Sequence, residues 1–403
     1  MGAVSVAPAS AEAGASVQLS WTVQDTGSAP ASGGWQDAVY LGTSPGATTT
    51  LLGLFSEPAS SPVPAGGSYS DTEPVTIPAG TSAGSYYLTV VADSDGSLAV
   101  SSTANDSGST SVTVTANPSK PTLRAVAEFP GAPEALAVGD GGTVVQWNGS
   151  WVAESSGTIN NLYGVAFDSY SGAAIVVGAH GTVLDTADGG SSWSIETPVT
   201  TEDLYSISCT GDSPTCWAVG AAGTVLATTD GTHWVPQSSG TSEPLYGVAC
   251  ISTSRCWAVG ANGTIIATTD GGTAWASQAS KTTETLYSIS CEPSGTTCWA
   301  VGAGGTVLTT TDGSTWSAEP SGTNADLYAV AVGSYCGGGF AFCLVAVGAG
   351  GTMLDYSGSS WGLAASGTSA DLYGFTYVTY FANGGYLAVG ADETELSGTA
   401  PQH

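Results

Sequence analysis

The chain has 403 residues, with 33 aspartates and glutamates against four lysines and arginines, and its formal net charge is −29 at pH 7. Nucleic acids and anionic membrane surfaces are bound through clustered cations, so this composition disfavours both as partners. The same charge favours solubility and is compatible with the binding of divalent cations or basic partners. The alternative is that the acidic residues only form a solvated surface in an exposed or salty setting.

Residues 1–116 do not repeat, and they carry a strand pattern of their own. Val17, Leu19, Trp21 and Val23 alternate with polar residues, which indicates a strand with one buried face. Further runs rich in β-forming residues follow, separated by turns of Gly, Pro and Ser. About seven strands in a segment of this length predict a β-sandwich.

Three stretches of this segment carry a family resemblance: SWTVQDTGSAPASGGWQDAVYLG, then SYYLTVVADSDG, then NDSGSTSVTVT. In this order they resemble the CARDB family of bacterial cell-adhesion-related, immunoglobulin-like domains. The resemblance implies an extracellular stalk or adhesion module, and it brings no catalytic residues to this chain.

The ADSDG stretch resembles half of a calcium-binding loop, so Asp93, Asp95 and Asp106 form a candidate metal site. The glutamate that completes such a loop is missing downstream. The alternative is a pair of Asx turns that cap a hairpin without an ion.

Met1 is followed by small residues without a basic start or an apolar core, so we expect no signal peptide in this sequence. No run of 18 apolar residues is present either. If the protein is exported, its leader and any anchor are removed or lie outside this sequence. Residues 117–122 are a short proline-containing linker between the sandwich and residues 123–403.

Residues 123–403 repeat one unit seven times. A Val-Gly pair, usually followed by a Gly-Thr turn, recurs every 39 to 46 residues, with its glycine at Gly139, Gly178, Gly220, Gly260, Gly302, Gly348 and Gly390. A Leu-Tyr pair precedes it in six units, and Leu123 holds the same place without a tyrosine. This period is that of a unit of four short strands.

Each unit is rich in β-forming residues between Gly, Asp, Ser or Asn turns, and none shows helical periodicity. Closing seven such sheets into a ring buries both faces of each. The predicted fold class is therefore all-β, an immunoglobulin-like sandwich followed by a seven-bladed β-propeller.

The seventh unit is short, because only 13 residues follow Gly390. They supply a third strand and no fourth, so its outer edge invites strand addition. We expect a homo-oligomer in which residues 3–8 or the sandwich edge of another copy completes this blade. The alternative is an edge that is covered within the chain or left short.

The eight cysteines form four close pairs, each between the end of a first strand and the start of a second: Cys209 and Cys216, Cys250 and Cys256, Cys291 and Cys298, Cys336 and Cys343. Opposed residues of a hairpin are close enough for a disulfide, so we expect four local bonds and an oxidising, extracellular location. Zinc is the competing interpretation, which needs pairs from neighbouring blades to converge.

Four units carry a Thr-x-Asp-Gly hairpin that ends in tryptophan, and this hairpin resembles the Asp-box (BNR repeat) of sialidase-like propellers. In that family the carboxylate caps the turn and the indole packs between sheets. The matching residues are Asp188, Trp193, Asp230, Trp234, Asp270, Trp275, Asp312 and Trp316. All seven units also resemble the photosystem II assembly factor family.

Five carboxylates stand just before the Leu-Tyr strands: Asp203, Glu243, Glu284, Asp326 and Asp371. These loops meet at one face of a propeller, so we predict an acidic ring at the channel mouth that binds calcium or a basic partner. The alternative is that the five side chains cap turns in solvent. No other cofactor is expected.

The small numbers of arginines and histidines limit the classes of enzyme that this chain could be. Sialidase chemistry needs three arginines, and this chain has only Arg124 and Arg255; the three histidines are scattered. We therefore predict a non-catalytic, exported bacterial cell-surface or matrix protein that binds proteins or glycans or builds a structure. The alternative is a secreted glycosidase that uses two carboxylates at the channel mouth. An assembly chaperone is disfavoured, because that role is associated with a basic patch.

Overall fold

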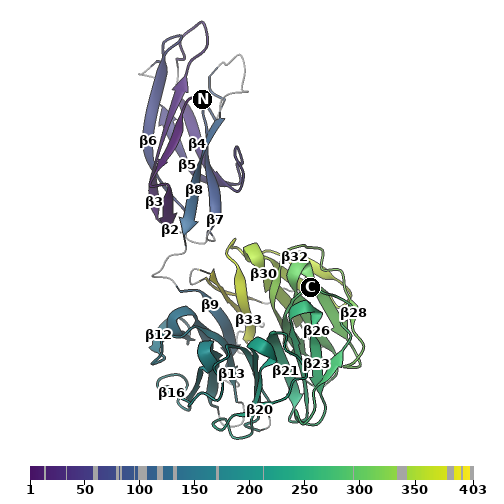
Figure 1. The fold of residues 1–403 in the computed structure, drawn as a ribbon. Helices are drawn as coiled ribbons and strands as arrows, with labels where there is room; N and C mark the ends of the chain where they lie inside the picture. The colour runs from purple at the N-terminus through teal and green to yellow at the C-terminus, as the bar shows by residue number, and fades with distance from the viewer. Residues whose placement is uncertain are drawn as a thin grey trace. The chain divides into compact units, whose positions relative to one another are not determined.

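The structure is a computed structural model that describes all residues except 13–14, 33, 58–61, 79–80, 82–83, 95, 99–106, 116–120, 130–133, 169–171, 212, 294, 334–342, 379–384, 392–393 and 400–403. The chain divides into two compact units, residues 1–120 and 121–403. Figure 1 labels strands of both units. In the described part of the chain, no helix is both long enough and apolar enough to span a membrane.

The first unit is a β-sandwich of two sheets. One sheet has the order β1 (Val4–Ala7), β3 (Ser16–Gln24), β6 (Ser68–Thr76), and the other has the order β2 (Ser10–Glu12), β8 (Ser107–Thr115), β7 (Gly84–Val91), β4 (Trp35–Gly42), β5 (Thr50–Glu57). Alternate residues of both sheets, among them Leu19, Trp21, Val39 and Leu88, form one buried core. The alternation seen in the sequence places this face correctly, and the predicted sandwich is confirmed.

A buried carboxylate ties the two sheets together at Asp37. Its oxygens accept hydrogen bonds from Trp21 Nε1 at 2.8 Å, from the Tyr69 hydroxyl at 2.6 Å and from the Asp93 backbone N–H at 3.1 Å. Burial raises the pKa of Asp37, and these three donors oppose that shift. A fully buried polar group needs such partners to be tolerated in a core.

The second unit consists of seven antiparallel sheets, so the predicted seven-bladed propeller is confirmed. Blade 1 is β9 (Leu123–Glu128), β10 (Ala135–Gly139), β11 (Thr143–Trp147), β12 (Trp151–Ser155); blade 2 is β13 (Leu162–Phe167), β14 (Ala174–Gly178), β15 (Val183–Thr186), β16 (Ser194–Ile195); blade 3 is β17 (Leu204–Cys209), β18 (Cys216–Gly220), β19 (Val225–Thr228), β20 (Val235–Gln237). Blade 4 is β21 (Leu245–Ser252), β22 (Arg255–Gly260), β23 (Ile265–Thr268), β24 (Ala276–Gln278); blade 5 is β25 (Leu286–Cys291), β26 (Cys298–Gly302), β27 (Val307–Thr310), β28 (Ser317–Ala318). Blade 6 is β29 (Leu327–Gly333), β30 (Cys343–Gly348), β31 (Met353–Tyr356), β32 (Trp361–Ala364); blade 7 is β33 (Leu372–Val378), β34 (Gly385–Gly390), β35 (Glu395–Thr399).

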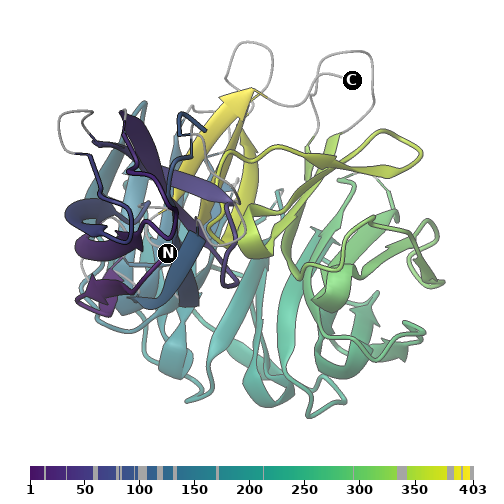
Figure 2. The ribbon, with the colours of Figure 1, turned by 90° about the horizontal axis from the view of Figure 1, so that it is seen from above.

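The blades follow one another around a ring, and the yellow last sheet returns to the blue first one in Figure 2. The second strand of each blade is its most buried: all five residues of β14, β18 and β26 are buried. The side chains of this strand pack against both neighbouring blades, in separate clusters on its two faces. The core of the propeller is therefore a closed series of interfaces between sheets.

A short 3-10 turn joins the second and third strands of blades 1 to 6: η1 (Asp140–Gly142), η2 (Ala179–Gly181), η3 (Ala221–Gly223), η4 (Ala261–Gly263), η5 (Ala303–Gly305) and η6 (Ala349–Gly351). The glycine of the Val-Gly pair, just before each turn, lets the backbone of the loop before the first strand come close to it. At Gly302, a Cβ atom would overlap the carbonyl oxygen of Thr285, whose oxygen accepts a hydrogen bond from the Ala303 N–H at 2.9 Å. The glycine thus lets the loop before the first strand lie against the turn.

Each blade is built from one continuous segment, including the two that meet where the ring closes. Blade 7 has three strands, with β35 as the outermost strand that the structure describes, and no strand of blade 1 or blade 7 joins the sheet of the other. The closure is made by side chains, among them Leu123 and Val126 of blade 1 and Leu387 and Val389 of blade 7.

Candidate functional site at the channel mouth

The first strand of every blade carries a β-bulge next to its buried leucine. In blade 3, Leu204 pairs with Gly220 and Ser206 pairs with Val219, which leaves Tyr205 as the extra residue. The same shift in the other blades makes the extra residues Arg124, Tyr163, Tyr246, Tyr287, Tyr328 and Tyr373. A bulge redirects a side chain, and here the redirected side chains line the central channel.

The six tyrosines form a continuous row of tilted rings around the channel. Successive centroids from Tyr163 to Tyr205, Tyr246, Tyr287, Tyr328 and Tyr373 lie 5.7, 5.3, 5.9, 5.5 and 5.0 Å apart. Arg124 occupies the seventh position, with its Cζ atom 5.1 Å from the Tyr373 centroid. We call these seven residues the channel ring.

Arg124 is held in place by Asp140 of the η1 turn. Its Nε and one terminal nitrogen each donate to a different carboxylate oxygen at 2.9 Å. Burial lowers the pKa of Arg124, but the hydrogen bonds and charge of Asp140 more than offset this effect. The fork geometry fixes the guanidinium plane beside the Tyr373 ring.

The channel ring surrounds a cavity of about 410 Å³. The residue after each ring position is alanine, glycine or serine, because neighbouring first strands approach closely there: a Cβ at Gly247 would lie 3.0 Å from the Cα of Ser288. The described lining residues include no aspartate or glutamate. A cavity of this size and wall chemistry is in the range of ligand sites.

Burial raises the pKa of four tyrosines of the channel ring, Tyr205, Tyr287, Tyr328 and Tyr373. Burial, together with the charges of Asp371 and the neighbouring tyrosines, raises the pKa of Tyr328 to about 12. Burial and Asp203 raise the pKa of Tyr205 in the same direction. These four phenols are therefore neutral at physiological pH, although negatively charged side chains lie nearby.

The five carboxylates predicted to form an acidic ring fall into two groups. Asp203, Asp326 and Asp371 each cap the turn of the preceding blade, accepting from the backbone N–H of His180, Gly304 and Gly350 at 2.8, 2.8 and 2.7 Å. Glu243 and Glu284 lie one residue further from their strands than these aspartates, and Glu243 accepts from Asn262 Nδ2 at 2.9 Å. The described residues contain no cluster of three or more His, Cys, Asp or Glu that would hold a metal ion.

Of the candidate calcium residues, only Asp93 lies among the described residues; Asp95 and Asp106 lie outside them. The Asp93 carboxylate accepts from the Leu98 backbone N–H at 3.2 and 3.3 Å. Leu98 lies five residues after Asp93, so this contact is local but is not an Asx turn, which bonds the N–H two residues on.

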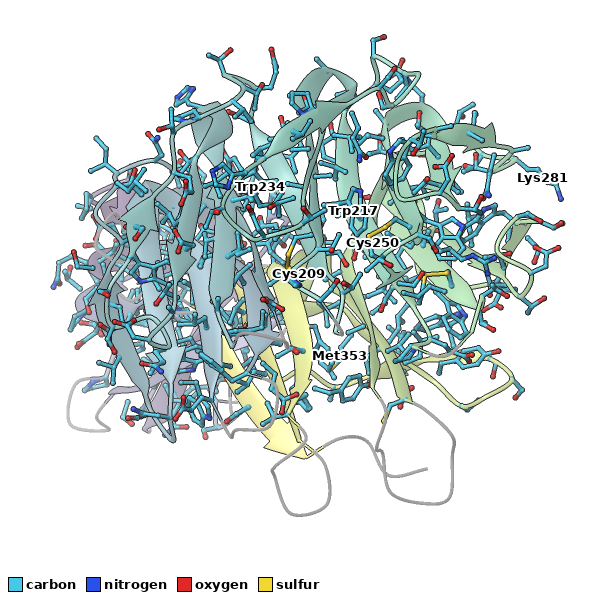
Figure 3. All side chains as sticks on the ribbon, turned by 90° about the horizontal axis from the view of Figure 1, so that it is seen from below. Cys209, Trp217, Trp234, Cys250, Lys281 and Met353 are labelled. Carbon is cyan, nitrogen blue, oxygen red and sulfur yellow. A yellow bond between two sulfur atoms is a disulfide. The ribbon has the colours of Figure 1, made fainter. Side chains whose placement is uncertain are left out.

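Three of the four predicted disulfides are present: Cys209–Cys216, Cys250–Cys256 and Cys291–Cys298, with Cα atoms 4.0, 4.1 and 4.0 Å apart. Each joins directly opposed residues of a first and a second strand. Cys209 and Cys250 are labelled in Figure 3. The fourth predicted pair includes Cys336, which lies outside the described residues.

The Asp-box carboxylates cap their own hairpins. Asp312 accepts from the backbone N–H groups of Ser314 and Thr315 at 2.8 and 2.7 Å, and these bonds lower its pKa. Asp230 and Asp270 make equivalent bonds, to Thr232 and His233 and to Ala274. In Asp188 the Ser192 and Thr186 hydroxyls and the Ser192 N–H lower the pKa from 3.8 to about 2.

Each tryptophan of these hairpins packs on the preceding blade: Trp193 on blade 1, Trp234 on blade 2, Trp275 on blade 3 and Trp316 on blade 4. In two interfaces the indole also donates to a glutamine of that blade, Trp275 to Gln237 at 3.0 Å and Trp316 to Gln278 at 2.7 Å. The same glutamine donates to the hairpin, Gln278 Nε2 to the Gly313 carbonyl at 2.9 Å. We call this arrangement the glutamine clasp.

The glutamine clasp was missed in the sequence, although a signal for it exists. A Gln or Glu stands three residues after the tryptophan in blades 1 to 5, and blade 6 has Ala364 instead. Ala364 packs in the interface between blades 6 and 7, to which blade 7 contributes no tryptophan. The channel ring was missed too, although the Leu-Tyr repeat with Arg124 in place of one tyrosine marks all seven of its residues.

The hydrogen bonds of Asp188 predict a pH-dependent contribution to stability. Because folding lowers the pKa of this carboxyl from 3.8 to about 2, its contribution is complete above pH 3.8 and is lost as the pH falls to about 2. We expect Ser192→Ala, which removes one donor at 2.6 Å, to lower the melting temperature at neutral pH. The difference from the unmodified chain should shrink toward zero as the pH falls through this window.

The matched control is Ser194→Ala on the same hairpin, at an exposed serine of β16. Thermal melts of both variants at several pH values decide the point. A difference for Ser192→Ala that is the same at every pH would contradict this role of Asp188.

Two family models match the chain. Residues 3–110 match CARDB, and residues 143–237 and 231–324 match the family described as photosynthesis system II assembly factor YCF48. The propeller resembles the YCF48 family. Both resemblances seen in the sequence are thereby confirmed, the CARDB domain for the sandwich and the YCF48-like repeat for the propeller. No curated protein matches the chain in sequence.

Solved structures similar to the YCF48-like propeller support the fold. "YCF48 bound to D1 peptide" has a TM-score of 0.56 at 17% identity, covering 71% of this chain and 94% of that chain. YCF48 from Cyanidioschyzon merolae has a TM-score of 0.55 at 17% identity, covering 70% and 97%. The WD40 propeller of Doa1 has a TM-score of 0.54 at 13% identity, covering 69% and 93%. At these identities the likeness shows the fold alone.

Proposed function

We propose that this chain is an exported bacterial cell-surface or extracellular-matrix protein that binds a protein partner at the channel ring and catalyses no reaction. The observation that carries the proposal is the row of six tyrosines around a cavity of about 410 Å³. Tyrosines offer large, rigid contact area with a polar tip, and they are enriched where proteins bind one another. A glycosidase would need two carboxylates facing this cavity, and its described lining has none.

The similar structures support peptide binding as the activity of such a propeller. One of them is YCF48 in complex with a D1 peptide. We carry over from it only the class of ligand, a segment of protein. Glycan binding is a further prediction for the cell-surface setting.

A peptide-display selection tests the proposal. Peptides selected on the whole chain are measured by calorimetry on the same chain and on Tyr246→Leu/Tyr287→Leu, which removes two adjacent rings of the channel ring. We expect the double substitution to weaken binding at least about tenfold. Ile195→Ala, at a residue 57% exposed on β16, is the control and should leave binding unchanged. Selected peptides that bind the double variant as tightly would place the binding surface elsewhere.

The export part of the proposal is supported by the three disulfides, because such bonds persist in oxidising compartments. We expect rapid thiol trapping on cells that produce the protein, followed by non-reducing mass spectrometry, to find only the local pairs. Free thiols, bound zinc or a disulfide between blades would contradict this assignment.

We still propose self-association through blade 7, but with a donor strand other than residues 3–8. Val4–Ala7 is paired with β3 over four residues, so donating this segment to another copy would break that ladder. We therefore assign strand donation to another edge of the sandwich. Light scattering that finds only monomers at high concentration would end this part of the proposal.

A further inference from the structure

The channel ring already holds one cation, and this shows how a second one would bind. The Arg124 guanidinium lies against the Tyr373 ring, 5.1 Å from its centroid. The other five tyrosines are half-buried, and each presents the same ring toward the cavity. Tyrosine faces attract cations because of their ring quadrupole, most strongly where water is partly excluded.

The charges around the channel ring favour a positive ligand. Asp203, Asp326 and Asp371 accept one backbone hydrogen bond each at their Oδ1 atoms, so their charges are not paired with a side-chain cation in the described contacts. Asp371 lies close enough to the ring to accept from the Tyr373 hydroxyl at 3.3 Å. After burial, the charges of these aspartates also raise the pKa of Tyr205, Tyr287, Tyr328 and Tyr373.

Among the described residues, the cavity lining holds a single cation. Arg124 is the one cationic residue among the described lining, and its charge is compensated by the two hydrogen bonds to Asp140. Lys281 lies at the periphery in Figure 3, where its Nζ donates to the Trp316 carbonyl at 3.0 Å. A basic group from outside is therefore attracted to the mouth, where Arg124, paired with Asp140, is the one cation of the described lining.

We propose that the channel ring binds a lysine or arginine side chain from a basic segment of a protein partner. The inference rests on the proposed function and names the chemistry of its ligand. The apolar stem of such a side chain packs on the tyrosine rings, and its cationic end is held by the ring faces within the field of the three aspartates. The cavity of about 410 Å³ holds a side chain of this size.

The test compares two blocked pentapeptides, acetyl-Gly-Ser-Lys-Ser-Gly-amide and the same peptide with norleucine in place of lysine. The two differ only in the charged end of one side chain. Saturation-transfer NMR on the whole chain should show contact between the lysine methylenes and tyrosine ring protons. We expect the lysine peptide to bind at least about tenfold more tightly than the norleucine peptide, in the millimolar range.

Two substitutions at one position separate the ring from its hydroxyl. Tyr246→Leu removes the aromatic face and should weaken lysine-peptide binding by about tenfold, whereas Tyr246→Phe keeps the face and should change it less than about threefold. Asp326→Asn should weaken binding most at low salt. Thermal melts verify that each variant is folded, and the comparison of the two peptides on the unmodified chain needs no variant.

The outcomes separate this inference from the proposed function. Equal binding of both peptides, lost in Tyr246→Leu, would overturn the preference for a cation and leave the channel ring as a binding site. Lysine-peptide binding that survives Tyr246→Leu would overturn both. No binding of the lysine peptide at about 10 mM would overturn the cation inference alone, since the display selection tests the proposed function without assuming charge.

Discussion

Trp316→Ala should lower the free energy of unfolding of the propeller by about 4 kcal/mol, the largest effect we expect from a single substitution. Trp316 is fully buried between blades 4 and 5, among Trp257, Ile265 and Leu308. Its removal leaves a cavity that two sheets cannot close, because their backbones are held by their own hydrogen bonds. It also leaves the Gln278 side-chain oxygen without its indole donor.

Denaturant unfolding followed by circular dichroism measures this effect. Trp316→Phe keeps part of the packing and should cost clearly less. Ile159→Ala, at a residue 88% exposed, is the matched loss of a large apolar side chain from the surface and should be nearly neutral. If Trp316→Ala cost less than about 1 kcal/mol, the interface between the sheets would not depend on this indole.

Gly302→Ala should destabilise the propeller by about 3 kcal/mol, because the added methyl group must displace backbone. The new Cβ would overlap the Thr285 carbonyl, which is itself fixed by the Ala303 N–H. The φ angle of Gly302 is −169°, which any residue adopts, so the expected cost comes from overlap alone.

The control lies two residues away in the same turn. Gly304 has a φ of +60° with open space around its Cα, and the equivalent residue of blade 4 is Asn262 at φ +53°. Gly304→Asn should therefore change stability by less than about 1 kcal/mol. Denaturant melts of the two variants test the pair together, and similar losses in both would contradict the overlap at Gly302.

Structural elements that are determined by nearby residues in the chain could be predicted from the sequence. Alternation in Val17–Val23 marks a strand with one buried face, and the Val-Gly and Leu-Tyr repeats mark two strands of every blade. The cysteines at opposed strand ends predicted the three described disulfides. Each of these follows from spacing along the chain.

The candidate site depends on register, which spacing does not reveal. Asp203 caps the turn of the preceding blade because it directly precedes Leu204, whereas Glu243 is one residue further away and bonds Asn262. Similarly, Tyr205 reaches the channel because a bulge makes it the extra residue of its strand. One position in a β-strand changes the face of a side chain, so a repeated motif alone could not assign these roles.

The closure between blades 1 and 7 also changes what a ligand at the channel ring would do. Neighbouring blades belong to different sheets throughout the ring, but blades 1 and 7 are also not consecutive in the chain, so among the described residues neither a strand ladder nor a connecting loop joins them. Arg124 and Tyr373 lie on opposite sides of that junction and meet at the ligand site. A ligand that contacts both binds only the closed ring, and by mass action it then opposes the first step of ring opening. Reversible ligand binding at the channel ring would thus stabilise the closed form of the whole propeller.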